Sequence, residues 1–228
     1  MSDLLLDPVK NALDTVHARF AVGTGPARRY PADVAPFAVV ADASHGSLAQ
    51  LEELIMPGER IYLLGDPPPT TKGLGIGSPL HTFQMLGPAE IPNEDGDGEI
   101  DTVLLDSKHA PAMVDLTTLA FPGFFRPRTN EMGTYYGVQV NGELIAMAGE
   151  RLCMTGLHEI SGVCTHPAHT GKGYARKLMT RLLQRHASMG VKSFLHVSKA
   201  NTHAARIYER MGFQTIRSMT LWPISRIP

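Results

Sequence analysis

Two glycines near residue 170 have the spacing of loops that bind phosphate groups. Gly171 and Gly173 permit backbone conformations that a Cβ would obstruct, and they let a ligand come close to the main chain. A buried strand is predicted over residues 160–165, and apolar residues at helical spacing predict a helix over residues 175–189. A glycine loop that opens a helix directs free amide groups and the positive end of the helix dipole outward. The sequence therefore predicts an anion site of the kind that binds a nucleotide-type cofactor.

Two common nucleotide-binding motifs do not fit this loop. A P-loop needs a glycine five residues before its second glycine, where the chain has His166. It also needs a serine or threonine after Lys172, where the chain has Gly173. A Rossmann fingerprint needs a third glycine where Arg176 stands, and an acidic residue about twenty positions further on, where residues 191–195 offer none. The short glycine pair alone is weak evidence, so its interpretation depends on residues downstream.

A second cluster of motif residues follows the predicted helix. Residues 193–197 read as a short strand, and residues 204–211 read as a helix that ends at Gly212. Together with the glycine loop, this stretch resembles the coenzyme A site of the GNAT acetyltransferase superfamily over about residues 100–228. The matching positions are Val163, Pro167, Gly171, Gly173, Ala175, Asn201, Ala204, Tyr208, Gly212 and Phe213. Thr170 departs from the pattern, because the family usually carries arginine or glutamine there.

The resemblance implies which residues contact the cofactor, acetyl-CoA. Backbone groups of Val163 and Thr165 would pair with the pantetheine arm as an added strand does, and one of their amides would stabilise the oxyanion. The loop and the start of the helix would hold the pyrophosphate. The implied cofactor-binding set is Val163, Thr165, Thr170, Gly171, Lys172, Gly173, Tyr174, Ala175, Asn201 and Tyr208. No metal is expected to take part.

Two side chains are predicted to take part in proton transfer. Glycine N-acyltransferases, the branch of the superfamily that this chain resembles most, place a general-base glutamate eight residues before the proline, where Glu159 stands here. A glutamate in an apolar strand region is expected to have a raised pKa, which suits a base near neutral pH. A charged residue at a strand edge is the alternative interpretation, and His158, on the opposite side of the strand, is the rival base. Tyr208 matches the family's general acid toward the coenzyme A sulfur.

The acceptor site is expected around residues 121–132, by the same resemblance. This segment contains three aromatic residues and two arginines, namely Phe121, Phe124, Phe125, Arg126 and Arg128. Arginines beside aromatic rings could hold a carboxylate, such as that of an amino acid. Aromatic rings that fill the space under a loop, with the arginines in solvent, explain the pattern equally well. The sequence does not choose among amino acids, polyamines, peptides and drug-like amines as acceptors.

The composition is that of an ordinary globular enzyme. The chain has 228 residues, of which 43% are hydrophobic and 19% are charged. A formal net charge of -1 argues against a nucleic-acid partner, and two cysteines are too few for a disulfide framework. The N-terminus lacks the basic region of a signal peptide, and no apolar run approaches the roughly 18 residues of a membrane span. A cytoplasmic location without membrane contact is therefore expected, and a homodimer is left open.

The chain is predicted to fold as two α/β parts. Residues 98–228 would form a GNAT domain with a mixed, mostly antiparallel sheet, ending in a pair of strands around residues 215–225. Residues 1–92 alternate helices and strands without a glycine motif that suits a cofactor, so they would form a smaller, non-catalytic part. Glycine N-acyltransferases resemble such a tandem, which makes a degenerate copy of the GNAT fold one reading of this part. The acidic stretch 92–99 would be a turn or linker.

Local patterns also place single elements. Asn141-Gly142 is a strong signal for a type I′ turn between two strands of a hairpin. Helical spacing of apolar residues predicts a helix over residues 110–120. Residues 80–86 are compatible with a strand, whereas the prolines and glycines of residues 66–79 predict a loop.

The sequence therefore predicts an acyl-CoA-dependent N-acyltransferase. Acetyl would pass from acetyl-CoA to the amine of a small molecule or amino acid, by direct attack in a ternary complex. One alternative is a regulator that binds acetyl-CoA without turnover, against which the presence of Glu159 and Tyr208 argues. The other is an unrelated nucleotide-binding protein, which the missing serine or threonine after Lys172 disfavours.

Overall fold

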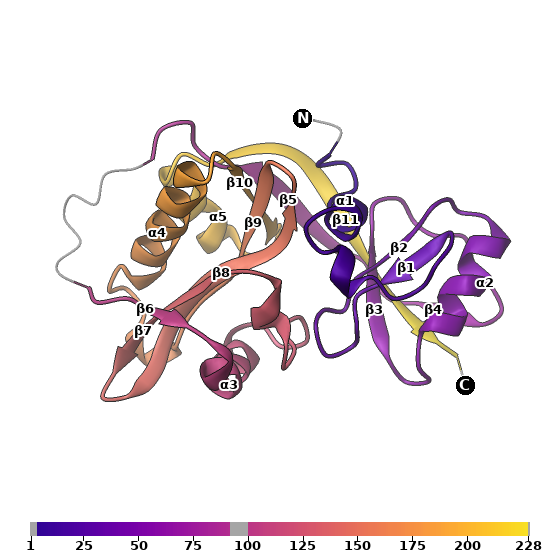
Figure 1. Ribbon diagram of the computed structural model, residues 1–228, viewed down its shortest axis with the longest axis horizontal. Coiled ribbons are helices and arrows are strands. Elements are labelled where there is room, and N and C mark those ends of the chain that lie inside the picture. The colour runs from indigo at the N-terminus through magenta and orange to yellow at the C-terminus, as the bar shows by residue number, and fades with distance from the viewer. Residues whose placement is uncertain (1–3, 92–99, 228) are drawn as a thin grey trace.

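The computed structural model describes residues 4–91 and 100–227 (Figure 1). The acidic stretch 92–99 and both predicted domain boundaries lie outside the described residues. The helices are α1 (Pro8–Asp14), α2 (His45–Leu54), α3 (Ala110–Ala120), α4 (Tyr174–Ser188) and α5 (Thr202–Arg210), with 3-10 turns η1 (Ala18–Phe20), η2 (Ser107–His109), η3 (Thr129–Met132) and η4 (Pro167–His169). The strands are β1 (Ala27–Arg29), β2 (Ala38–Val40), β3 (Arg60–Leu64), β4 (Leu74–Ile76), β5 (Leu80–Leu86), β6 (Val103–Leu105), β7 (Tyr135–Val140), β8 (Glu143–Met154), β9 (Leu157–Thr165), β10 (Lys192–Ser198) and β11 (Gln214–Arg226).

Several elements have the bounds that local patterns predicted. β5 and α3 agree residue for residue, and α4 begins and ends one residue before the prediction. Asn141 and Gly142 join β7 to β8, and both have positive φ, as a type I′ turn requires. The predicted loop 66–79 contains the short strand β4, which the pattern did not indicate because Gly75 interrupts its apolar residues.

One nine-stranded sheet contains strands from both predicted parts of the chain. Its order is β3-β11-β5-β10-β9-β8-β7-β6, and β4 pairs with β11. All of these pairs are antiparallel except β9 with β10, which confirms the mixed, mostly antiparallel sheet. β1 and β2 form a separate two-stranded sheet. A second sheet of the GNAT kind, as a degenerate copy would have, does not occur among the described residues.

The C-terminal strand joins the two ends of the molecule. β11 is one strand of 13 residues, so the predicted pair of strands around residues 215–225 is wrong. It pairs with β5 from Gln214 to Leu221 and with β3 and β4 from Leu221 to Arg226. Because β11 has a neighbouring strand to pair with along its whole length, it continues as one strand without a turn. Figure 1 shows β11 as a long bent ribbon that runs from the end near α5 to the side of α2.

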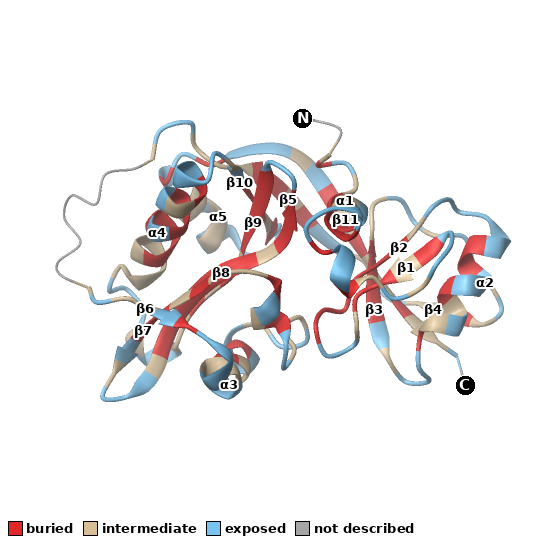
Figure 2. Ribbon diagram, viewed as in Figure 1, coloured by how far each residue is buried: buried red, intermediate tan, exposed pale blue. Residues whose placement is uncertain are grey.

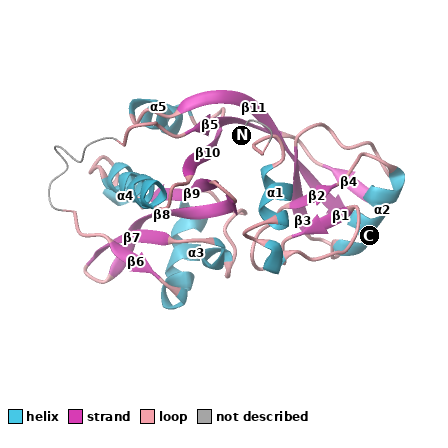
Figure 3. Cartoon of the chain, turned by 45° about the horizontal axis from the view of Figure 1, so that its top comes forward, coloured by secondary structure: helices cyan, strands magenta, loops and turns pink. Residues whose placement is uncertain are grey.

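Helices α3 and α4 cover opposite faces of the nine-stranded sheet (Figure 3). α4 packs on one face, where Leu178 meets Ile160 of β9 and Leu195 of β10. α3 packs on the other face, where Met113 lies in one cluster with Cys164 of β9. Figure 2 shows the buried residues along β8, β9 and the inner side of α4. None of the described helices has the length and apolar character needed to cross a membrane.

The insertion of β5 makes the hydrophobic core under α4 depend on the N-terminal half. Met85 of β5 is 1% exposed and packs in the same cluster as α4. We expect Met85→Ala to lower the free energy of unfolding by about 2–5 kcal/mol, because it leaves a cavity in this cluster. Urea denaturation, followed by circular dichroism and by fluorescence of the single tryptophan, Trp222, would measure the change.

The matched control is Met56→Ala, because Met56 is 67% exposed and its loss should change stability by less than about 0.5 kcal/mol. Trp222 lies on β11, where it also reports on the N-terminal half. Two separate transitions, with only one moved by Met85→Ala, would contradict the shared core.

Candidate active site

A cavity of about 760 Å³ opens beside the end of β9, where β9 and β10 have separated. These parallel strands pair only at their first residues, from Leu157 with Lys192 to Glu159 with Phe194. Beyond these pairs β9 continues along β8, and β10 continues along β5, so the two strands diverge. The end of β9, the glycine loop, the first turn of α4 and the helix α5 line the cavity. The cavity therefore lies where the sequence predicted the cofactor site.

The end of β9 turns unused amide groups toward this cavity. The N–H of His166 donates to the carbonyl of Ile145 on β8 at 2.7 Å. Because successive amides of a strand point in opposite directions, the N–H groups of Val163 and Thr165 point away from β8, toward the cavity. In the described part of the chain, no strand pairs with β9 on that side beyond Glu159. This edge can therefore take an extended ligand as an added strand.

The glycine loop has the conformation that an anion site needs. Gly171 and Gly173 have φ values of 77° and 79°, in the left-handed region that favours glycine. Gly173 caps α4 without a side chain, so the amides of the first turn have no capping side chain before them. Lys172, Arg176 and Arg210 also line the cavity, and none of its described lining residues is acidic. Amide groups, helix dipole and cations together favour a phosphate-bearing ligand.

The structure brings all ten predicted cofactor residues to this one cavity, namely Val163, Thr165, Thr170, Gly171, Lys172, Gly173, Tyr174, Ala175, Asn201 and Tyr208. Asn201 also caps α5, since its Oδ1 accepts a hydrogen bond from the amide of Ala204 at 3.1 Å. The sequence reasoning missed His169, His203 and Arg210, which also line the cavity. Helical spacing could have indicated His203 and Arg210, because they share a face of α5 with Ile207. Phe121, which was predicted for the acceptor site, lines the same cavity from the C-terminal end of α3.

Tyr208 keeps its proton at neutral pH. Burial raises the pKa of Tyr208 to about 12. An ordinary cysteine thiol has a reference pKa of about 8.5, so full proton transfer from this phenol to a thiolate of that kind is uphill. The hydroxyl can still donate a hydrogen bond to a sulfur on which negative charge develops. The position of Tyr208 on the cavity wall suits such a donor.

Glu159 lies outside the cavity lining and is 0% exposed. Its carboxylate accepts hydrogen bonds from Nε and Nη2 of Arg151 at 2.9 and 2.6 Å, and Nδ1 of His196 lies 2.8 Å away. Burial alone would raise the pKa of Glu159, but the charge of Arg151 and these hydrogen bonds outweigh it and lower the pKa to about 2. The predicted rise is therefore wrong, and the geometry favours a structural ion pair over a general base.

His158, the rival base, faces the other side of β9, as the strand period predicted. Its Nδ1 lies 3.0 Å from Oε1 of Glu150, and Nε2 of His186 on α4 lies 2.8 Å from the same oxygen. Burial alone would raise the pKa of Glu150, but hydrogen bonds with both histidines and the amide of Thr134 hold it well below its ordinary value. These three side chains could also hold a metal ion. As they stand, their hydrogen bonds fasten α4 to the sheet.

In the predicted acceptor segment, residues 121–132, Phe121 lines the cavity, whereas Phe124 and Arg128 serve packing. The ring of Phe124 stacks on Tyr62 with centroids 4.7 Å apart. Arg128 pairs with Glu131 at 2.8 Å and with Asp33 at 3.2 Å, so its guanidinium already holds two carboxylates. These contacts fasten the segment to the N-terminal half, and they leave Arg128 poorly placed to bind the carboxylate of an acceptor.

Comparisons with known proteins agree with this geometry. The profile of the acetyltransferase (GNAT) family matches residues 99–213, just over half of the chain. A solved structure of a GNAT-family protein from Novosphingobium aromaticivorans is 31% identical and superposes with a TM-score of 0.88, over 98% of this chain and 99% of that one. The chain therefore belongs to the acetyltransferase (GNAT) family, whose members use acetyl-CoA. The predicted family, fold class and enzyme class are confirmed.

Two further likenesses are more limited. The [ribosomal protein bS18]-alanine N-acetyltransferase of Haemophilus ducreyi is 34% identical over 68 residues, which are 28% of this chain. The chain spans about half the length of that curated relative, 47%. A GCN5-related N-acetyltransferase from Kribbella flavida superposes with a TM-score of 0.60 at 17% identity, over 94% of this chain and 91% of that one. The second likeness shows the fold alone.

The two loop glycines give a direct test of the cofactor site. We expect the double variant Gly171→Val/Gly173→Val to lose acetyl-CoA binding, because a β-branched residue cannot hold the left-handed conformation that presents the loop amides. Isothermal titration with acetyl-CoA measures the affinity, and circular dichroism confirms that the variant is folded.

A matched control is Gly58→Val/Gly190→Val. Both glycines have positive φ, a Cβ at either position meets nothing within 4 Å, and neither lines the cavity. The control should carry comparable backbone strain, but its affinity for acetyl-CoA should be unchanged. Undiminished affinity in the folded loop variant would show that the phosphates bind elsewhere.

Glu159→Gln distinguishes a structural ion pair from a general base. Because the variant leaves Arg151 buried without its counter-charge, we expect a loss of about 3–5 kcal/mol in the free energy of unfolding near neutral pH. The lowered pKa stabilises the fold above the ordinary glutamate pKa, and this contribution disappears as the pH falls toward about 2. The stability difference between the two proteins should therefore shrink between about pH 4.5 and pH 2, as urea titrations at several pH values would show.

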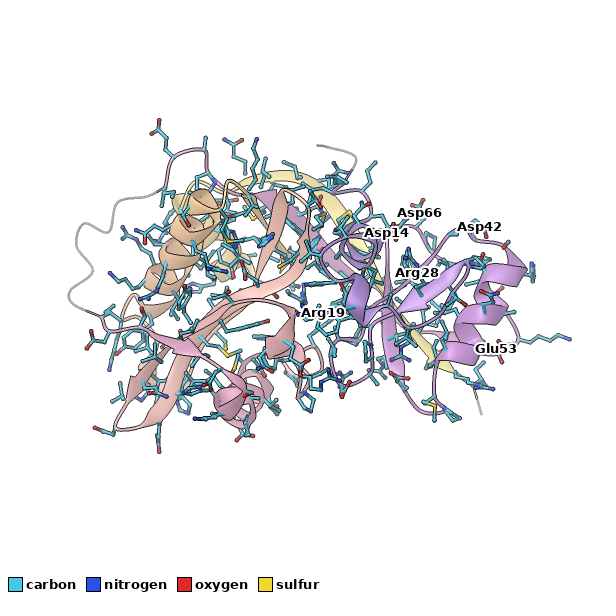
Figure 4. The ribbon with its side chains drawn as sticks, in the orientation of Figure 1. Asp14, Arg19, Arg28, Asp42, Glu53 and Asp66 are labelled. Atoms are coloured by element: carbon cyan, nitrogen blue, oxygen red, sulfur yellow. The ribbon has the colours of Figure 1, made fainter. Side chains whose placement is uncertain are left out.

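The control Glu53→Gln changes an exposed glutamate on α2, far from α4 (Figure 4), and should alter stability by less than about 0.5 kcal/mol. Turnover per folded Glu159→Gln molecule should stay within about threefold of wild type. A fall of 10²–10⁴-fold that recovers at alkaline pH would restore the general-base role.

Proposed function

We propose that this protein transfers the acetyl group of acetyl-CoA to the amine of a small molecule or amino acid, by direct attack of the amine in a ternary complex. The cavity beside the end of β9 carries this proposal, because the ten residues implied by the family motif gather around it. Membership of the acetyltransferase family supports turnover. The alternative of a regulator that binds acetyl-CoA without turnover is not favoured.

The cavity walls fit the chemical parts of coenzyme A in order. The amides of the glycine loop and the first turn of α4 would hold the pyrophosphate, with Lys172 and Arg176 adding positive charge. The outward N–H groups of Val163 and Thr165 would pair with the amides of the pantetheine arm. This placement brings the thioester to the inner end of the cavity, beside Cys164 and Tyr208.

The residues at the inner end would stabilise the charges of acetyl transfer. The amine nitrogen attacks the thioester carbon, and an outward amide of β9 donates to the oxygen that becomes negative. The carbon–sulfur bond then breaks, and the electron pair leaves on the sulfur. Tyr208 donates a hydrogen bond to this thiolate, which later takes its proton from water. The phenol thus stabilises the leaving group without giving up its own proton.

The proton of the acceptor amine would leave to water. In the described part of the chain, no carboxylate lines the cavity, and Glu159 is held by Arg151 and His196. We therefore propose that the acceptor reacts from its neutral fraction. The rate should then rise with pH until the free amine is fully deprotonated.

Several expectations from the sequence stay predictions. These are the chemical class of the acceptor, a cytoplasmic location, the absence of a nucleic-acid partner, the absence of a metal from the reaction, the homodimer that the sequence left open, and the division at residues 92–98. The matched relative from Haemophilus ducreyi, which by its name acetylates an alanine of a ribosomal protein, adds a peptide with N-terminal alanine to the acceptors worth testing.

A thiol-release assay tests the proposal. The panel contains glycine, alanine, spermidine, an aminoglycoside and a short peptide with N-terminal alanine, each with acetyl-CoA. We expect release of coenzyme A with at least one amine, and mass spectrometry should find that amine acetylated. Tyr208→Phe should lower kcat by roughly 10²-fold while the Kd for acetyl-CoA changes little, because the lost hydrogen bond forms only as the sulfur becomes negative.

Tyr136→Phe is the matched control, because Tyr136 lies outside the cavity lining, under the guanidinium of Arg181 on α4. It should leave kcat within about twofold of wild type. A wild-type protein that binds acetyl-CoA and acetylates no amine of the panel would overturn this acceptor class, and one that does not bind acetyl-CoA would overturn the whole proposal.

A further inference from the structure

The hydroxyl of Tyr135 is buried without a hydrogen-bond partner among the described residues. Tyr135 is 1% exposed, and its ring meets Phe125 edge to face with centroids 5.6 Å apart. A phenylalanine would pack in the same place without burying a polar group. An unpaired hydroxyl in the interior destabilises a protein by about 1–3 kcal/mol, so its presence calls for an explanation.

Two glycines let this ring reach from β7 to β9. Tyr135 lies opposite Gly149 on β8, and Gly149 lies opposite Ser161 on β9. A Cβ at Gly149 would overlap the ring, and a Cβ at Gly162 of β9 would lie 3.2 Å from its Cε1. The phenol therefore crosses β8 over one glycine and ends against the other. The ring therefore brings its hydroxyl close to β9, the strand that lines the cavity.

The ring ends at an irregularity of β9. The pairing of β8 with β9 shifts between Met147 and Gly149, and Gly162 has a φ of 64°. The next residues along β9, Val163 and Cys164, line the cavity. Tyr135 shares a hydrophobic cluster with Cys164, with Phe121 at the edge of that cluster. The hydroxyl therefore lies behind the inner end of the cavity, on the face of the sheet that carries α3.

The charged groups that act on this phenol, Arg151, Glu159 and Glu150, already have partners. Glu159 is bound by Arg151, His196 and the amide of Leu152. The hydroxyl of Tyr30, the other buried phenol near this ion pair, lies 2.9 Å from Nδ1 of His17. Tyr30 thus has a hydrogen-bond partner within the protein, whereas Tyr135 has none among the described residues. A bound molecule, a ligand or a water, is the remaining source of a partner for Tyr135.

We propose that the Tyr135 hydroxyl binds the acceptor, by accepting a hydrogen bond from an N–H of the amine and so turning the nitrogen lone pair toward the thioester. This inference rests on the proposed acetyl transfer. Burial raises the pKa of Tyr135 well above its ordinary value, so the phenol orients the amine and does not take its proton. Because the hydroxyl is enclosed, the segment of Phe121 and Phe125 must move aside as the acceptor enters.

Tyr135→Phe tests the inference, with the panel amine that the wild-type enzyme acetylates fastest. The variant keeps the ring and removes the hydroxyl. We expect kcat/KM for the amine to fall on the order of 10-fold, the Kd for acetyl-CoA to stay within twofold, and the melting temperature to stay equal or rise. The control Tyr136→Phe removes a hydroxyl from the next residue of β7, on the opposite face, and should change none of these values.

The outcomes separate this inference from the proposed function. Wild-type kcat/KM in Tyr135→Phe, with acetyl-CoA binding and turnover intact, would overturn the role of the hydroxyl alone. A lower melting temperature with unchanged kcat/KM would also overturn it, because it would show that a bound water, and not the acceptor, is the partner. Failure of the wild-type protein to bind acetyl-CoA or to acetylate any panel amine would overturn both.

Discussion

The open cavity depends on where β10 finds hydrogen bonds after it leaves β9. A strand that departs from its neighbour exposes a row of backbone groups, and burying them unpaired is costly. Here β5, from the N-terminal half of the chain, pairs with β10 from Phe194 to Ser198. β10 therefore keeps its hydrogen bonds with β5 as it separates from β9. The edge of β9 that faces away from β8 leaves its amides available to a ligand. The first 90 or so residues thus shape the cofactor site without lining it.

The buried ion pair of Glu159 lies at the point where the two strands part. Glu159 and Phe194 are the last pair between β9 and β10. The carboxylate binds Arg151 of β8 and lies beside His196 of β10, so it holds three strands together at this point. On the opposite face, Glu150 binds His158 of β9 and His186 of α4. One buried carboxylate on each face therefore cross-links the elements around the point where the strands part.

Local patterns predicted the glycine loop, the helices and the hairpin, because each depends on residues close together in the chain. Much of the cavity lining could be predicted for the same reason, since residues 163–175 form one continuous stretch of the chain. The position of β5 in the sheet and the continuity of β11 depend on pairing between strands more than 100 residues apart. Hydrophobic periodicity does not encode such pairing. The direction of the Glu159 pKa shift was predicted wrongly because the charge of Arg151 was overlooked. A regular hairpin register would place Arg151 and Glu159 on opposite faces of the sheet, and the register shift between Glu150 and Cys153, which no sequence pattern indicates, brings them together.

The course of β11 also has a consequence for how the chain reaches its native state. Among the described residues, β3 and β4 pair within the large sheet with β11 alone, which is synthesised more than 130 residues later. Until then both segments carry unpaired edges, the kind of surface on which nascent chains associate with one another. Contacts of such long range also make folding slow. The pairing of β11, which completes the sheet last, is therefore the folding step at which productive folding and aggregation compete.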